Sequence, residues 1–97
     1  MVEHILLMRW KEQASQDATE RVMEGLRGFK EKIPGIVDLT CGVNFSPRAR
    51  GYTHALCIRF RDRAALDAYF PHAEHQRVVH ELMDPISEEV LILDYEY

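Results

Sequence analysis

The side chains most able to do chemistry lie together in residues 69–75, which read Tyr-Phe-Pro-His-Ala-Glu-His. Histidine gains and loses a proton near neutral pH, and a tyrosine hydroxyl can donate a hydrogen bond to a developing negative charge. Tyr69, His72 and His75 therefore predict a site for acid–base chemistry. Two other interpretations stay open: the histidines pack against apolar neighbours with their nitrogens bonded to backbone carbonyls, or they bind a metal ion.

The rest of the chain predicts the elements that position these residues. Runs of β-branched, aliphatic and aromatic residues indicate strands at 2–10, 37–44, 52–60 and 88–95. Apolar residues at helical spacing, with Ser15 and Asp62 as N-caps, indicate helices at 15–32 and 62–83. Pro71 has no backbone N–H, so the second helix should break there into pieces at 62–69 and 72–83.

The order β-α-β-β-α-β predicts an α+β, ferredoxin-like fold, with a four-stranded antiparallel sheet and both helices on one of its faces. No linker or repeat interrupts residues 1–97, and we expect a single domain. In this topology the first strand lies between the third and the fourth. His4 and Asp94 should then meet on one face of the sheet, at the end near Tyr69, His72 and His75.

These residues supply the roles that acid–base catalysis needs. His75 would act as the base, Asp94 would orient its imidazole, and Tyr69 would donate a hydrogen bond. His54 lies near the start of the third strand, at the opposite end of the same face. At 3.3 Å per residue it is roughly 10 Å or more from His4. We therefore place His54 outside the inner cluster.

A metal site is the weaker alternative. His72 and His75 would be joined by His4 or Asp94 as a third ligand, as in catalytic zinc sites. A histidine pair at this spacing is a weak signal alone, so no metal is expected. The chain also lacks a glycine-rich phosphate loop and a dinucleotide-binding motif.

The strands are apolar on both faces of the predicted sheet. Ile5 and Leu7 in the first strand, and Leu91 and Leu93 in the last, point away from the face that carries His4. Two helices can cover only one face, and an apolar patch of that size is rarely left exposed on a monomer. We therefore predict a homodimer in which two sheets pack against each other.

Composition restricts the other partners. The formal net charge is −4 and no basic face is evident, which argues against binding of nucleic acid. The longest aliphatic run, residues 5–8, is too short for a membrane span or a signal peptide. We therefore expect no membrane partner and a cytoplasmic location.

Several segments together resemble the stress-responsive dimeric A/B barrel family, known as Dabb. They are Val-Glu-His-Ile-Leu-Leu at 2–7, Ile-Pro-Gly-Ile at 33–36, Gly-Tyr-Thr-His-Ala-Leu at 51–56, and Tyr69-x-x-His72-x-x-His75. The ending Leu-Ile-Leu-Asp-Tyr at 91–95 is similar too. The resemblance implies a dimeric α+β barrel, with a pocket between sheet and helices in each subunit and no cofactor.

A plant member of this family closes a linear polyketide by an aldol condensation that needs no cofactor. The resemblance implies that His75 and Tyr69 are catalytic, with Asp94 as their carboxylate partner. The other histidines and the apolar walls would bind a small hydrophobic carbonyl ligand; these residues are His4, His54, His72, Leu6, Met8, Leu56 and Val79.

Two departures from the family pattern bear on function. The family usually has His-Pro-x-His, whereas here the proline precedes His72 and Ala73 follows it. Leu26 or its neighbours occupy the place of a pocket tyrosine of the cyclase, which favours a smaller or less polar substrate. The sequence thus predicts a cofactor-independent, polyketide cyclase-like enzyme. The alternatives are a non-catalytic stress-responsive dimer with a binding or structural role and, less favoured, a cofactor-free oxygenase.

Overall fold

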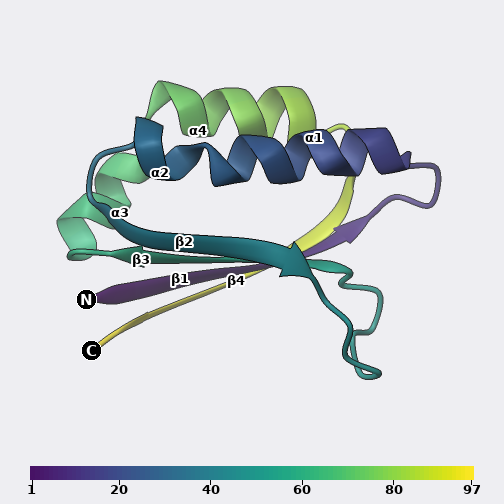
Figure 1. Ribbon diagram of the computed structural model, residues 1–97, viewed down its shortest axis with the longest axis horizontal. Helices are drawn as coiled ribbons and strands as arrows, with labels where there is room; N and C mark the ends of the chain where they lie inside the picture. The colour runs from purple at the N-terminus through teal and green to yellow at the C-terminus, as the bar shows by residue number, and fades with distance from the viewer.

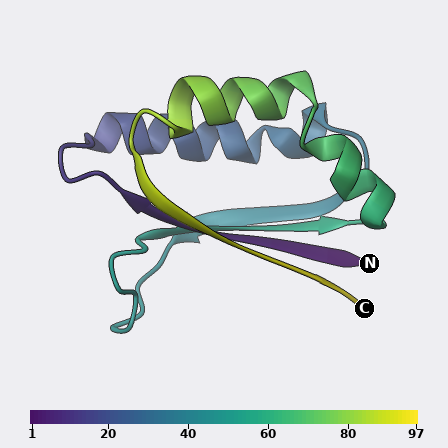
Figure 2. The ribbon, with the colours of Figure 1, turned by 180° about the vertical axis from the view of Figure 1, so that it is seen from behind.

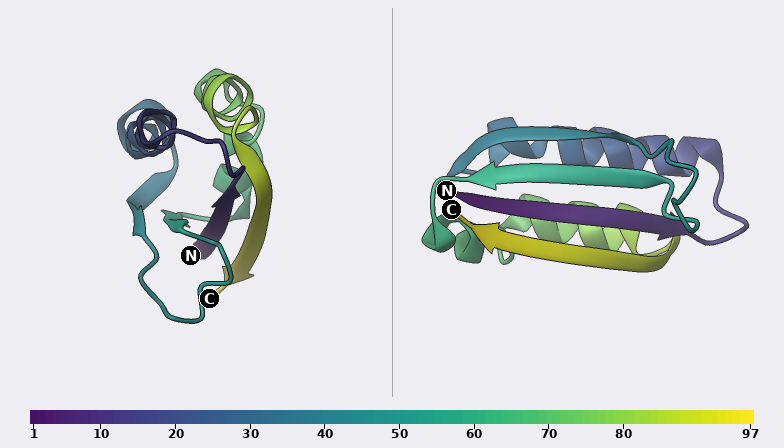
Figure 3. Two further views of the ribbon diagram at one scale, coloured as in Figure 1. Left: turned by 90° about the vertical axis from the view of Figure 1, so that its right-hand side faces the viewer. Right: turned by 90° about the horizontal axis from the view of Figure 1, so that it is seen from below.

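Four antiparallel strands form one sheet in the order β2-β3-β1-β4, as the computed structural model of all 97 residues shows (Figures 1 and 3). The strands are β1 (Val2–Trp10), β2 (Ile36–Val43), β3 (His54–Phe60) and β4 (Ser87–Glu96). The helices are α1 (Gln16–Arg27), α2 (Phe29–Lys32), α3 (Arg63–Tyr69), α4 (Ala73–Arg77) and the π-helical segment η1 (Val78–Met83). The predicted ferredoxin-like fold is confirmed.

All helices lie on one face of the sheet, which we call the inner face. α1 runs behind β2 and β3, whereas α4 and η1 run behind β1 and β4 (Figure 3, right). The view from behind shows α3 at the end of the sheet where both termini lie (Figure 2). This end is therefore the place where the β3–α3 connection, α4 and the end of β4 come together.

The helix boundaries follow from local capping. The Ser15 hydroxyl accepts a hydrogen bond from the Ala18 N–H, and the Asp62 carboxylate accepts one from the Ala65 N–H, so both predicted N-caps are confirmed. The first helix is not continuous to Lys32 but divides at Gly28 into α1 and α2. Glycine is a poor helix former, which accounts for the division at this position.

The predicted break at Pro71 is present, but the helix after it differs from the expected one. α4 is a single short stretch of α-helix, and the chain then widens into the π-helical η1. The widening changes which residues face the core, so Val78 and Met83 are buried. Gly25 on α1 permits this packing, because a Cβ there would lie 3.0 Å from both methyl groups of Val78.

The core fills the space between the inner face and the helices. Met8, Leu56 and Phe29 are among its fully buried side chains. The opposite face of the sheet, which we call the outer face, carries no helix (Figure 3). Leu91 and Leu93 of β4 are about half exposed there, as expected for strands that are apolar on both sides.

Candidate functional site

A cavity of about 260 Å³ lies between the inner face and the helices, and its lining extends from His4 and Tyr69, near the termini, to Met83 and Val90. β1 and β4 form one wall, and α1, the α3–α4 connection and η1 form the others. The lining is mainly apolar and contains two histidines and a tyrosine: His4, Leu6, Leu26, Tyr69, Phe70, His75, Val79, Met83, Asp84, Val90 and Ile92.

Tyr69, the last residue of α3, brings a buried phenol to this cavity. Its side chain is 1% exposed and packs edge to face against the rings of Phe29 and Phe60. No group of the protein forms a hydrogen bond with its hydroxyl, yet the oxygen is not fully enclosed, because it borders the cavity. Burial, with the nearby charge of Asp94, raises the pKa of Tyr69 well above its ordinary value. The phenol therefore stays protonated and can donate to a ligand.

His75 of α4 lies beside Tyr69, with 4.4 Å between the two ring centroids. Its Nδ1 is 3.0 Å from the Phe70 carbonyl oxygen, which can only accept, so Nδ1 carries the hydrogen and Nε2 keeps its lone pair. Burial is the largest effect on this imidazole and lowers the pKa of His75. At neutral pH the ring is therefore a neutral base with one free nitrogen.

The helix break at Pro71 explains why the Phe70 carbonyl is available. In a continuous helix this oxygen would accept from the N–H four residues later, that of Glu74. Here the Glu74 N–H donates instead to Nδ1 of His72, which serves as the N-cap of α4. The His75 ring and the Gln76 amide donate to the vacated oxygen. His72 thus has a capping role and does not line the cavity.

His4 is the second imidazole of the cavity and is 1% exposed. Its Nδ1 lies 2.5 Å from Oδ1 of Asp94. This differs from the predicted pairing, in which Asp94 orients His75. The reason is the strand register: His4 and Asp94 are directly opposed cross-strand residues on the inner face. The carboxylate therefore supports His4, and a backbone carbonyl orients His75.

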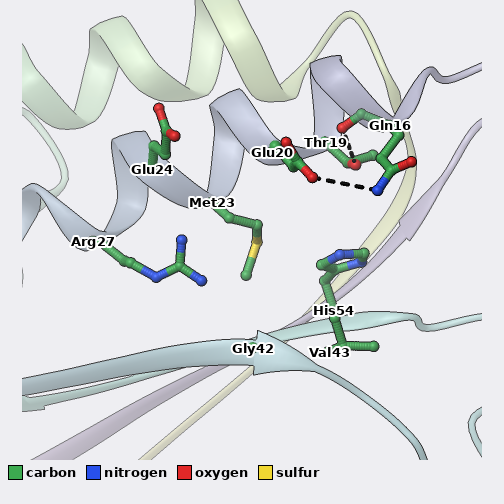
Figure 4. Close-up of a pocket in the computed structure, with 9 residues that line it drawn as sticks. All are labelled: Gln16, Thr19, Glu20, Met23, Glu24, Arg27, Gly42, Val43 and His54. Carbon is green, nitrogen blue, oxygen red and sulfur yellow. Dashed lines mark hydrogen bonds between the residues drawn. The ribbon is translucent and has the colours of Figure 1, made fainter.

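His54 lies in a different hollow, as its position in β3 predicted. It borders an open groove of about 500 Å³ between α1 and the ends of β2 and β3 (Figure 4). Its Nδ1 accepts a hydrogen bond from the Trp10 indole N–H at 2.9 Å. Although this groove is larger than the cavity, polar and charged residues of an exposed helix face form most of its lining. The structure does not bring His54 to Tyr69 and His75.

The apolar walls were predicted only in part. Leu6 and Val79 line the cavity, whereas Met8 and Leu56 belong to the buried core beyond it. The sequence reasoning missed the Phe70 carbonyl as a partner of His75. The signal was present in the Pro71-His72 dipeptide, because a proline followed by a capping residue leaves a preceding carbonyl without its helical donor.

Two further structural findings concern a metal and the membrane. No three His, Cys, Asp or Glu side chains come close enough together to form a group that holds a metal ion. None of the helices has both the length and the apolar composition needed to cross a bilayer. The cytoplasmic location stays a prediction.

The fold and the cavity first define a class: a ferredoxin-like α+β protein in which two imidazoles and a phenol share an apolar cavity between sheet and helices. The chain belongs to the stress responsive A/B barrel domain family, whose model matches residues 2–97. The family resemblance seen in the sequence is thus confirmed.

Individual relatives agree with this assignment. A stress-response A/B barrel domain-containing protein of Arabidopsis thaliana is 35% identical over 68 residues, which cover 69% of this chain and 26% of that protein. The match thus spans about a quarter of the length of this relative. Among solved structures, the hydroxynitrile lyase from Passiflora edulis superposes with a TM-score of 0.87 at 26% identity, covering 97% of this chain and 90% of that one. A dimeric ferredoxin-like protein of unknown function from Jannaschia sp. CCS1 gives 0.80 at 28% identity, covering 99% and 98%.

Proposed function

We propose that the protein is a cofactor-independent enzyme that forms or breaks a carbon–carbon bond next to a carbonyl group, as in an aldol-type cyclisation. One observation carries this proposal: three groups able to exchange protons meet in an apolar cavity. They are Nε2 of His75, the unpartnered hydroxyl of Tyr69 and the His4 imidazole supported by Asp94. A convergence of proton-transfer groups in an apolar cavity is typical of acid–base active sites.

The geometry suggests a role for each group. Nε2 of His75 removes a proton from a carbon between two carbonyls, and the resulting carbanion attacks the acceptor carbonyl. Tyr69 donates a hydrogen bond to the oxygen that becomes negative. The Asp94 carboxylate holds the His4 imidazole in place beside the reacting groups. The proton held by His75 then moves to the oxygen that became negative, which closes the cycle with no net change in the protein.

The named activity of one relative fits the same chemistry. A hydroxynitrile lyase splits a hydroxynitrile into a carbonyl compound and hydrogen cyanide, and that reaction also needs a base, here for the hydroxyl proton, and an acid for the leaving cyanide. At 26% identity over 97% of the chain, the Passiflora edulis protein supports the reaction class for this chain. It does not distinguish a lyase from a cyclase.

The cavity size favours a small substrate. At about 260 Å³ the cavity is below the range of roughly 300–1,000 Å³ that suits drug-sized ligands. Leu6, Val79 and Ile92 would contact the hydrophobic part of the molecule. We therefore propose a compact hydrophobic carbonyl compound as the ligand rather than a long polyketide chain.

The test compares product formation from two probes, a short poly-β-ketone thioester and an aromatic hydroxynitrile. Wild type is measured beside His75→Ala, with His54→Ala as the matched control because that histidine lies outside the cavity. We expect His54→Ala to resemble wild type and His75→Ala to lose about hundredfold to ten-thousandfold in rate. Identical product mixtures from wild type and His75→Ala would refute the enzymatic proposal and favour the non-catalytic alternative.

We also propose that the protein forms a homodimer through the outer faces of two sheets. Leu91, Leu93 and Tyr95 each expose about half of their surface on a single copy. The Jannaschia protein, 28% identical over 99% of this chain, is described as dimeric. Sizing chromatography with light scattering at micromolar concentration tests the proposal, and a uniform monomer would contradict it.

A further inference from the structure

A chain of hydrogen bonds runs along the exposed side of α4 and η1, from the Phe70 carbonyl to the Asp84 carboxylate. The Gln76 amide nitrogen lies 2.7 Å from the Phe70 oxygen. The Gln76 amide oxygen lies 2.8 Å from Nε2 of His80, and Nδ1 of His80 lies 3.0 Å from Oδ2 of Asp84. Gln76, His80 and Asp84 follow one another at intervals of four residues, so they form one stripe on the helix surface.

The Phe70 carbonyl fixes the direction of the bonds in this chain. A carbonyl oxygen only accepts, so the NH2 group of Gln76 faces it and the Gln76 oxygen faces outward. That oxygen accepts in turn, so Nε2 of His80 donates to it. The Asp84 carboxylate holds the other side of the same ring at Nδ1. His80 thus anchors the Gln76 amide in the orientation that points its NH2 group at Phe70.

The same carbonyl oxygen orients His75. Its two lone pairs are taken by the Gln76 amide at 2.7 Å and by Nδ1 of His75 at 3.0 Å. The Glu74 N–H, which would reach this oxygen in a continuous helix, donates to His72 instead. Gln76 therefore bridges the helix break, because it ties residue 76 back to residue 70 and leaves no lone pair free for Glu74.

Packing alone does not decide which nitrogen of His75 faces the cavity. The ring lies against the rings of Phe29, Tyr69 and Phe70, with centroid distances of 6.0, 4.4 and 5.7 Å. A half-turn of the imidazole about its bond to Cβ exchanges each nitrogen with a carbon of nearly the same size, so apolar contacts barely distinguish the two orientations. The hydrogen bond at Nδ1 does distinguish them, because it places the hydrogen on Nδ1 and leaves the lone pair on Nε2.

We propose that Gln76 is a positioning residue for His75, anchored in that role by His80 and Asp84. Its amide holds the Phe70 carbonyl where Nδ1 of His75 donates to it, so that the nitrogen with the lone pair faces the cavity. Neither Gln76 nor His80 lines the cavity, so both act through the carbonyl and not on the substrate. The inference rests on the proposed function for the role of His75 as the base, whereas the orientation of its ring can be measured without any turnover.

The first measurement is the position of the hydrogen on the His75 ring. Gln76→Met keeps the length and neutrality of the side chain but removes the donor to Phe70. Exposed polar contacts contribute little to stability, so the variant should fold as wild type does. Nitrogen NMR at pH 6.5, above the lowered pKa of His75, distinguishes a ring nitrogen that carries hydrogen from one with a lone pair. The His75 signals are assigned from their absence in His75→Ala.

Wild type should carry the hydrogen on Nδ1 of His75. In Gln76→Met we expect the ratio of the Nδ1–H to the Nε2–H form to fall about twofold to tenfold, the effect of one hydrogen bond. His80→Ala should give a smaller shift in the same direction, because the donor stays and only its anchor is lost. The matched control is Gln16→Met, since the Gln16 amide donates to Glu20 on α1 and to no backbone carbonyl. His75 signals that are the same in Gln76→Met as in wild type would overturn the proposal.

Kinetics give the second measurement. With His75 as the base, Gln76→Met should lower kcat about twofold to tenfold and leave KM unchanged, because it disturbs the orientation of the base and no contact with the substrate. A wild type that turns over neither probe would refute the proposed function, and the nitrogen signals would still decide the role of Gln76. An active wild type whose Gln76→Met variant keeps both its kcat and its His75 signals would refute the positioning role alone.

Discussion

The hydroxyl of Tyr69 offers a test that separates function from stability. Tyr69→Phe removes one oxygen and leaves the ring, which makes the packing contacts with Phe29 and Phe60. Because the hydroxyl has no hydrogen-bond partner in the protein, its loss breaks no internal bond. The variant should therefore fold as wild type does while losing the donor that faces the ligand.

The expected change in the free energy of unfolding is smaller than the expected change in transition-state stabilisation. A buried hydroxyl without a partner costs about 1–3 kcal/mol when it is fully desolvated, and this one still borders a cavity. We expect the free energy of unfolding to stay the same or to rise by at most about 1 kcal/mol. For a domain of this size that is a shift of no more than about 4–8 °C in Tm. Loss of one donor to an oxyanion removes about 2.7–4 kcal/mol of transition-state stabilisation, which lowers kcat about 10²–10³-fold.

The matched control is Tyr97→Phe, the same chemical change on the outer face. The Tyr97 hydroxyl donates to Glu3 and is remote from the cavity lining, so turnover per subunit should not change at concentrations where light scattering shows the variant to have the same assembly state as wild type. Calorimetry gives the stability of both variants, and product formation from the probe turned over by wild type gives their activity. A Tyr69→Phe variant that is as active as wild type would show that the phenol is only a packing residue.

Three further predictions concern the histidines. Burial lowers the pKa of His75 below 6.5, so the acid limb of the kcat/KM profile should have its midpoint below pH 6.5. The lowered pKa favours the neutral form of His75 in the folded protein. Its contribution to stability is therefore present above pH 6.5 and is lost as the pH falls. Asp94→Asn removes the carboxylate that orients the His4 imidazole and should lower the rate by about 10²–10⁴-fold, measured in the same assay. His54→Gln removes the bond from Trp10 and should cost about 1 kcal/mol in chemical denaturation while leaving the rate unchanged.

The fold was predictable because its signals are local and consistent. Ser15 and Asp62 fix the starts of two helices through their own side chains. Pro71 cannot donate a backbone N–H inside a helix, so a kink or break is expected there from the sequence alone. The two-residue period of a strand assigns its residues to the two faces of the sheet. The π-helical η1 was not predictable from such signals, because no capping residue or proline marks it, and its Val78 packs closely against Gly25 on a different helix.

The sequence predicted which residues meet at the site better than it predicted which of them form hydrogen bonds with each other. Topology alone brings His4, Tyr69, His75 and Asp94 together, and the structure does place all four at one end of the sheet. The predicted partner of Asp94 was wrong, because the strand order alone places the imidazoles of both His4 and His75 near this carboxylate. Register decides between them at the level of one residue: His4 is opposite Asp94, whereas His75 reaches a carbonyl that a helix break has freed.

β1 and β4 connect the cavity to the proposed dimer interface. Adjacent residues of β1 lie on the two faces, since His4 lines the cavity and Glu3 binds Arg59 on the outer face. β4 is an edge strand whose residues are mostly exposed on a single copy, yet it carries Asp94. An uncovered edge strand opens locally more easily than a covered one.

A dimer that covers β4 should therefore also hold Asp94 on His4, and catalysis should depend on dimerisation. Gly42→Leu places a large side chain on the outer face of β2, where it should weaken the dimer, and it touches no cavity residue. We expect the activity per subunit of this variant to fall on dilution and to follow the fraction of dimer. Wild type, measured over the same concentrations, should keep its activity until its own dimer dissociates. Activity that stays constant while light scattering shows the variant to be monomeric would mean that a single copy holds the Asp94–His4 pair without help.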